Sequence, residues 1–386
     1  MRDGYRIIDT DTHVGPSVET LEQFAGPVLR ERWDELDVFR QPSSEGGHHL
    51  SIHPFPYRRK LGTRPEGELA AATGGASPLK GSVSRTSLPT PYTPGVNDLN
   101  SAGRLADMDK EGVDVHLVIP GTFVTAVSAL DPALAREIWA AYRRYIEAYC
   151  AADTERLKAT VPVSGADPEA AAMIVHEQAR LPHVAAATVV LPEGLPVDDP
   201  TLEPIWRAMN EHDLPLLHHS FFYEPPYFPG YRDIWGNVVV ARAAAHPWGA
   251  ERLTAYCILS GLFDRYPNLR LGFAECSAGW LPGWLVRLGG QKRYMRHAVP
   301  ETKLDDPLDY ARAGHVFCGI ELYEGETLAK SIVDVVGEDV LMYQSDYPHP
   351  GGEFPDSPAV VLGWTSLGDG AMRKLLSGNA ERFLRL

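Results

Sequence analysis

The sequence predicts a single (β/α)8 barrel with an insertion after its first strand, and three observations lead to this prediction. The chain has 386 residues, a length that α/β barrels often reach as one domain. Short segments rich in Val, Ile and Leu alternate with longer amphipathic segments, which is typical of parallel strands joined by helices. Counting from the amino terminus gives eight such strand segments, and this number favours a barrel over a doubly wound sheet.

The predicted elements follow in order. Residues 7–13 form the first strand, and residues 16–33 contain a loop and a short helix. Residues 39–99 are rich in Gly, Pro and Ser with little apolar periodicity, so we expect an inserted loop or lid there. The remaining strands are expected at 113–120, 157–163, 185–191, 214–219, 269–275, 315–321 and 340–346. Helices are expected at 101–111, 131–152, 168–180, 202–212, 238–263, 281–296, 327–336 and 369–386.

Composition narrows the classes of partner. The 51 acidic and 36 basic residues leave a net charge of -15, which disfavours a nucleic acid or an anionic membrane as partner. The four cysteines are widely spaced and mostly sit in apolar segments, so we expect buried thiols in a reducing compartment. A charged-then-apolar leader and a long apolar run are both missing from the sequence. We therefore expect a cytoplasmic protein without a membrane span.

The first predicted strand carries candidate metal ligands. Asp9, Asp11 and His13 occupy alternate positions, and because strand side chains alternate between faces, all three are expected to point the same way. A carboxylate and an imidazole two residues apart can chelate one divalent cation. Catalytic groups of a (β/α)8 barrel lie at the carboxyl ends of the strands, so the other strand ends are the places to look for further ligands.

Three more strand ends carry ligand-type side chains. The fifth predicted strand ends in His218 and His219, the sixth in Glu275, and the eighth leads into Asp346 and His349. Together with the first strand, four strands therefore deliver carboxylates and imidazoles to one mouth of the barrel. The sequence predicts a metal site at this mouth, with room for one or two ions.

Several segments match a known pattern. They are Ile-Ile-Asp-Thr-Asp-Thr-His, Leu-Pro-Leu-Leu-His-His, Leu-Gly-Phe-Ala-Glu, Gln-Ser-Asp-Tyr-Pro-His and Ser-Gly-Asn-Ala-Glu-Arg-Phe. Together they resemble the amidohydrolase superfamily, in the branch that contains aminocarboxymuconate semialdehyde decarboxylase and γ-resorcylate decarboxylase. The resemblance covers nearly all of the chain outside residues 39–99. It implies a barrel of the metal-dependent hydrolase type that holds a divalent cation and acts on a small molecule.

The resemblance also implies roles for individual residues. Asp11 and His13 fall on the ligand pair of the first strand, and Asp346 falls on the eighth-strand aspartate that binds metal and handles protons. On the fifth strand, His219 shares a face with Leu217 and has the family's spacing from the preceding proline. We therefore expect His219 to be the ligand and His218 to lie outside the barrel.

The sixth strand departs from the decarboxylases, which carry a histidine where this chain has Glu275. Glu275 is expected to share a face with Leu271 and Phe273 and to point inward. A buried carboxylate needs a cation or a proton, so Glu275 is a candidate metal ligand or general base, with a structural salt bridge as the alternative. His349 is a candidate second acid or base. If two metals bind, Glu275 is the better bridging ligand.

Other residues are expected to be structural. Asp9 is expected to position a neighbouring loop or ligand, and the histidines of the insertion, His48, His49 and His53, to be solvated. Two further histidines are expected to pack in the core: His116 and His246. Aromatic residues that follow the ligand-bearing strands could wall a substrate pocket or belong to the core: Phe221, Phe222, Tyr223, Tyr227 and Trp280.

The predicted function is a metal-dependent hydrolase or non-oxidative decarboxylase that acts on a small, aromatic carbonyl or carboxylate compound with one zinc or manganese ion. The alternative is a nonheme diiron monooxygenase, because a mouth rich in carboxylates and histidines would suit two irons. Helix 131–152 carries aromatic residues that look exposed in the sequence, so a homodimer is also expected.

Overall fold

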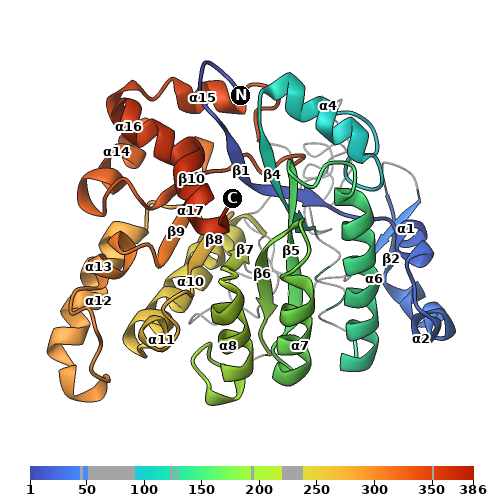
Figure 1. Ribbon diagram of the computed structural model, residues 1–386, viewed down its shortest axis with the longest axis horizontal. Coiled ribbons are helices and arrows are strands. Elements are labelled where there is room, and N and C mark those ends of the chain that lie inside the picture. The colour runs from blue at the N-terminus through green and yellow to red at the C-terminus, as the bar shows by residue number, and fades with distance from the viewer. Residues whose placement is uncertain are drawn as a thin grey trace, which may run out of the picture.

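Eight parallel strands form one sheet that nearly closes into a barrel, with helices around its outside (Figure 1). The computed structural model describes the chain except residues 44–46, 51–91, 122–123, 125–126, 128–129, 193–194, 220–237 and 350–351. The strands follow the order β1 (Ile8–Val14), β4 (Val115–Pro120), β5 (Leu157–Ser164), β6 (Val184–Val190), β7 (Leu216–His219), β8 (Leu271–Ala274), β9 (Val316–Ile320) and β10 (Leu341–Tyr343). The backbone N–H of His13 donates to the carbonyl of Tyr347 at 2.7 Å and joins β1 to the chain after β10. The predicted (β/α)8 barrel is confirmed.

Helices connect successive strands as the sequence predicts. The longer ones are α4 (Ser101–Glu111), α6 (Pro132–Cys150), α7 (Pro168–Gln178), α8 (Glu203–His212), α10 (Val238–Leu259), α12 (Leu281–Tyr294) and α14 (Gly325–Val335). The shorter ones are α1 (Val18–Gln23), α2 (Pro27–Glu31), α11 (Leu262–Arg265), α13 (Pro307–Arg312), α15 (Ser357–Leu362), α16 (Gly368–Arg373) and α17 (Asn379–Leu384). Short 3-10 helices, among them η1 (Trp33–Phe39) and η5 (Leu322–Glu324), and one π-helical turn (Lys374–Gly378) complete the set. Within the described part of the chain, no helix combines the length and apolarity needed to cross a membrane.

The carboxyl-terminal helix α17 closes one end of the barrel. Phe383 belongs to the apolar cluster inside the barrel and lies 5.3 Å from the ring of Phe317. Gly272 of β8 faces the ring of Phe383, and a Cβ atom at this position would lie 2.4 Å from that ring. Gly272 and Phe317 are each the second residue of their strand, so α17 fills the amino-terminal end. The carboxyl-terminal end is left for the functional side chains.

The aromatic face of α6 packs inward, which corrects the basis for the expected homodimer. Trp139, Tyr142, Tyr145 and Tyr149 are at most 5% exposed and form one apolar cluster with residues of β1, β4 and β5. The spacing of these aromatics follows the helical repeat, so all of them reach the side that covers the strands. The surface on which the expectation of a dimer rested is therefore part of the core of one chain.

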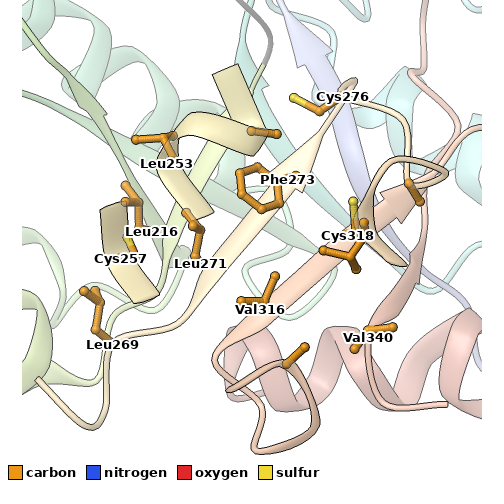
Figure 2. Packing of buried hydrophobic residues seen from close by; sticks show 14 of the residues in the cluster. Leu216, Leu253, Cys257, Leu269, Leu271, Phe273, Cys276, Val316, Cys318 and Val340 are labelled. Atoms are coloured by element: carbon orange, nitrogen blue, oxygen red, sulfur yellow. The ribbon is translucent and has the colours of Figure 1, made fainter. Parts of the chain in front are cut away.

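The four cysteines are free and buried, as predicted. Three of them, Cys257, Cys276 and Cys318, are seen in the packing between β8, β9 and the outer helices (Figure 2). Burial raises the pKa of the Cys150 thiol to about 12. A protonated thiol is a poor nucleophile and a poor metal ligand, so this cysteine serves packing.

Only part of the predicted insertion at 39–99 is described. It contains an antiparallel pair of short strands, β2 (Arg40–Pro42) and β3 (His48–Leu50). His48 lies on the surface with Nδ1 at 2.7 Å from Glu19, which fits the expected solvated histidine, whereas His53 lies outside the described residues. At the end of the insertion, the Tyr92 hydroxyl donates to the carbonyl of His349 at 2.8 Å. The insertion therefore returns to the barrel beside a candidate catalytic residue.

Candidate metal centre

A β-bulge in β1 brings Asp11 and His13 to the mouth of the barrel. The register of β1 against β4 shifts between Asp9 and Thr12, where β1 advances three residues and β4 advances two. Ile8 packs inside the barrel, and strict alternation from Ile8 would turn Asp11 outward. The bulge reverses the alternation. The expectation that Asp9 shares the face of the two ligands is therefore corrected, since Asp9 does not join their cluster.

Asp9 instead ties β1 to the chain that follows β10. One carboxylate oxygen accepts from the backbone N–H groups of Asp11 and Ser345, both at 3.1 Å, and the other accepts from the Ser345 hydroxyl. Burial raises the pKa of Asp9 well above its usual range. The expected supporting role of Asp9 agrees with these contacts, because Ser345 directly precedes Asp346.

Four side chains from three strands converge at the mouth. Nε2 of His13 lies 3.1 Å from an oxygen of Asp11, 3.1 Å from an oxygen of Asp346 and 3.1 Å from Nε2 of His219. Nε2 of His219 also lies 3.5 Å from Asp11. Ligand atoms that share one cation stand about this far apart, since each lies roughly 2 Å from the ion. The arrangement can therefore hold a divalent metal.

The carboxylate of Asp11 carries the strongest indication of a cation. It is completely buried, and neither oxygen has a hydrogen-bond partner among the described residues. Burial alone would raise its pKa, but His219 and His13 outweigh burial and lower it. A buried carboxylate without hydrogen bonds is costly. A cation between Asp11 and the two imidazoles would remove this cost, and oxygen and imidazole donors suit manganese, zinc or iron.

The carboxylates around His13 also shift its pKa. Burial lowers its pKa, but Asp11 and Asp346 act in the opposite direction and raise it to about 10. The imidazolium form takes the place that a cation would occupy, because both are positive charges held between carboxylates. A metal must therefore displace a proton from His13, so binding should weaken as the pH falls.

Asp346 and His349 form a close pair at the edge of the cluster. Nδ1 of His349 lies 2.5 Å from Asp346, and its ring stacks on His13 with centroids 4.4 Å apart. Burial would raise the pKa of Asp346, but His349 and His13 lower it. His13, Asp346 and His349 make a second group with ligand-type geometry, which shares His13 with the first group.

Glu275 lies at the mouth, but strand alternation, which was expected to turn it inward, does not explain its position. Leu271 and Phe273 face the outer helices, where Phe273 and Leu253 share one apolar cluster (Figure 2). A regular strand would send Glu275 outward with them. Glu275 follows the end of β8 with φ +50°, and its carboxylate lies 3.4 Å from Nε2 of His219. The inward position is thus set by a left-handed backbone, a conformation that often marks functional sites.

A further carboxylate, Glu321, was not singled out from the sequence. It follows β9, and its pKa is raised well above the usual range, first by burial and then by Asp11, Asp346 and Glu275. Its backbone N–H donates to Glu324 at 2.9 Å in a reciprocal capping box. The signal was present in the sequence, because Glu321 ends the seventh predicted strand as Glu275 ends the sixth.

Three other buried histidines lie outside the two groups of ligand-type side chains. His218 is buried outside the barrel against Phe273, and a Cβ atom on Gly249 would lie 2.9 Å from its Nε2. Burial, helped by Arg252, lowers the pKa of His218 to about 3. Nδ1 of His116 lies 3.3 Å from the buried guanidinium of Arg104, and a third histidine is also buried: His246.

Of the aromatics considered for a pocket wall, only Trp280 is described. Its Nε1 donates to the carbonyl of Ser277 at 2.9 Å, and its ring meets Phe273 at 5.5 Å. Trp280 therefore packs against the core at the start of α12. The others lie outside the described residues: Phe221, Phe222, Tyr223 and Tyr227.

Comparisons with known proteins agree with this architecture. The amidohydrolase family model matches residues 96–386. A curated relative, 2-amino-3-carboxymuconate-6-semialdehyde decarboxylase of Dictyostelium discoideum, is 27% identical over 202 residues, which cover 50% of this chain and 51% of the relative. The match thus spans about half the length of that relative.

Two solved structures have the same fold. The chain superimposes with a TM-score of 0.67 on 5-carboxyvanillate decarboxylase from Novosphingobium aromaticivorans, at 19% identity over 100% of this chain and 97% of the other. A dihydroxybenzoic acid decarboxylase from Polaromonas gives a TM-score of 0.63 at 17% identity, over 99% and 97% of the two chains. The family match covers well over half of the sequence and coincides with the barrel and its mouth. This chain is a member of the amidohydrolase family.

Proposed function

We propose that this protein is a manganese-dependent, non-oxidative decarboxylase of a small aromatic carboxylate. The observation that carries the proposal is the convergence of Asp11, His13 and His219, with ligand-type atoms 3.1 to 3.5 Å apart around a carboxylate that has no hydrogen bond among the described residues. Two decarboxylases with this fold hold manganese together with a nitrobenzoic acid or a nitroresorcinol. These ligands support manganese and an aromatic substrate here.

The proposed ligands are Asp11, His13, His219 and Asp346, with Glu275 as a fifth candidate. When bound, the cation would anchor the carboxylate or a neighbouring hydroxyl of the substrate and stabilise negative charge. Asp11, His13 and His219 are buried, so their charges lie in a medium of low dielectric, where electrostatic interactions are strong.

The protein must also supply a proton. Decarboxylation breaks a carbon–carbon bond, releases carbon dioxide and leaves an electron pair on the ring carbon, which then takes up a proton. The pair of Asp346 and His349 is placed to deliver it, because an oxygen of Asp346 lies 2.5 Å from Nδ1 of His349 and a proton can pass between the two groups. Glu275, at 3.4 Å from His219, is the second candidate donor.

Hydrolysis by the same centre is the second candidate function, because Glu275 takes the place of the strand-six histidine of the decarboxylases and could act as the base for a bound water. The diiron monooxygenase alternative gains no support from the relatives named above, which are decarboxylases. Each of the three reactions has its own product or co-substrate, so one set of assays separates them.

The test is a product assay on protein stripped of metal and reloaded with Mn²⁺. We expect carbon dioxide release from hydroxylated benzoates, with 5-carboxyvanillate and 2,6-dihydroxybenzoate included in the panel. In D2O the product should carry one deuterium at the carbon that lost the carboxylate. Asp346→Asn should lower kcat by at least about 100-fold, whereas Asp264→Asn, which alters a carboxylate bonded to Tyr310, should leave kcat unchanged.

Other outcomes would overturn the proposal. Hydrolysis of esters or lactones without carbon dioxide release from any carboxylate would identify a hydrolase. Consumption of dioxygen coupled to hydroxylation would identify a monooxygenase.

A further inference from the structure

Arg104 of α4 is buried directly behind the candidate metal centre. Its guanidinium lies on the face of β1 that carries Thr12, where Nη1 donates to the Thr12 hydroxyl at 3.1 Å. Nη2 donates to the backbone carbonyl of His13, and Nε donates to the Tyr149 hydroxyl at 2.9 Å. Nη1 also lies 3.3 Å from Nδ1 of His116. The Arg104 side chain therefore forms hydrogen bonds with both the backbone and a side chain of β1, the strand that carries Asp11 and His13.

The charge of Arg104 is not balanced by an ion pair within the described part of the chain. Its partners are neutral: hydroxyls, a carbonyl, an imidazole and the faces of two tyrosines, with the guanidinium carbon 4.9 Å from the ring centroid of Tyr347 and 5.7 Å from that of Tyr149. Burial and the positive charge of Arg104 lower the pKa of His116 well below its usual value, so this imidazole stays neutral. A buried cation without a carboxylate contributes little to stability, which favours a role in geometry.

Tyr347 connects Arg104 to the second ligand-bearing segment. It directly follows Asp346, its carbonyl accepts from the N–H of His13 at 2.7 Å, and its hydroxyl donates to Asp107 at 2.6 Å. Arg104 thus contacts the backbone of His13 and the ring next to Asp346 at the same time. Together with Asp9 and the backbone bond from His13 to Tyr347, this guanidinium holds the place where β1 meets the chain after β10.

We propose that Arg104 is a positioning residue that fixes His13 relative to Asp346 and thereby sets the affinity of the site for a divalent cation. This inference rests on the proposed metal centre. The planar guanidinium donates in several directions in a fixed geometry, which the single ammonium of lysine cannot reproduce. Arg104→Lys therefore keeps the charge and loses the geometry.

The experiment is calorimetric titration of the stripped full-length protein with Mn²⁺, with the electron paramagnetic resonance spectrum of the bound ion as a second readout. Residues that orient metal ligands typically change affinity 10- to 100-fold, so Arg104→Lys should raise Kd by about that factor and alter the spectrum. The matched control is Arg156→Lys. Arg156 also donates to backbone carbonyls, at 3.1 Å from Val113 and 3.2 Å from Asp114. These carbonyls lie at the amino-terminal end of β4, away from the mouth of the barrel. The Kd of this control should equal that of the wild type.

A second variant covers failure of Arg104→Lys to fold. Tyr149→Phe removes the hydroxyl that accepts from Nε and donates to the Val96 carbonyl at 2.5 Å. Loss of the hydrogen bond to Arg104 should raise Kd about fivefold, the effect of one hydrogen bond. Unchanged Kd and spectrum in both variants, with a lower Tm in the absence of metal, would overturn the inference and leave Arg104 a structural residue. If the wild type itself does not bind Mn²⁺, the proposed function fails instead.

Discussion

Replacing Asp11 with asparagine should abolish the stabilisation of the protein by Mn²⁺. The two side chains have nearly the same shape, but asparagine is neutral and brings an amide N–H₂ donor in place of one oxygen. The Asp11 carboxylate lies between His13 and His219 and has no hydrogen bond among the described residues. Its charge therefore favours a positive partner, either the His13 imidazolium or a metal cation, and the substitution removes that charge.

The size of the effect follows from linkage. A ligand at 100 times its Kd stabilises the folded state by about 2.7 kcal/mol. At about 2.1 cal/mol/K per residue, the 386 residues have an unfolding entropy of about 0.8 kcal/mol/K. Saturating Mn²⁺ should therefore raise the Tm of the wild type by about 3 °C, and the Asp11→Asn variant should show no rise.

The assay is thermal unfolding with chelator and with Mn²⁺ for both proteins. Asp264→Asn is the matched control, because Asp264 of α11 accepts from Tyr310 of α13 at 2.7 Å, in the outer layer of helices. The control should have a lower Tm in chelator and keep the full rise of about 3 °C with Mn²⁺. A full rise in the Asp11→Asn variant would refute the assignment of Asp11 as a ligand.

Two further predictions concern stability. Gly272→Ala places a methyl group 2.4 Å from Phe383 and should lower the free energy of unfolding by about 1–3 kcal/mol. In contrast, Gly283→Ala in α12 meets nothing within 4 Å and should raise it by about 0.5–1 kcal/mol; urea titration measures both, and equal effects would contradict the steric argument. Burial raises the pKa of Glu111, which accepts from Ser357, to about 7. A carboxyl with a raised pKa keeps its proton in the folded protein, so its contribution to stability is full below about pH 4.5 and is lost as the pH rises through 7. Glu111→Gln stays neutral, so its free energy of unfolding should gain on that of the wild type by roughly 3 kcal/mol between pH 4.5 and 8. Parallel plots of unfolding free energy against pH for the two proteins would refute this prediction.

The sequence alone determined the order of the barrel and most of the groups at its mouth. Hydrophobic periodicity is a local property, so eight strands alternating with helices could be recognised without knowledge of the packing. Because parallel strands of a barrel end at one mouth, residues that end separate strands were expected to meet. Asp11, His13, His219 and Asp346 do lie together.

Tertiary structure decided the orientation of those side chains for which the local rules of strand alternation and helix exposure do not hold. A bulge in β1 turns Asp11 inward and separates it from Asp9, and a left-handed residue after β8 turns Glu275 inward although Phe273 faces outward. Neither feature has a local sequence signal, since the cost of a bulge or of a positive φ is met by contacts with distant segments. The same holds for Tyr145 on α6, because a helix shows which residues share a face and only packing shows whether that face is covered.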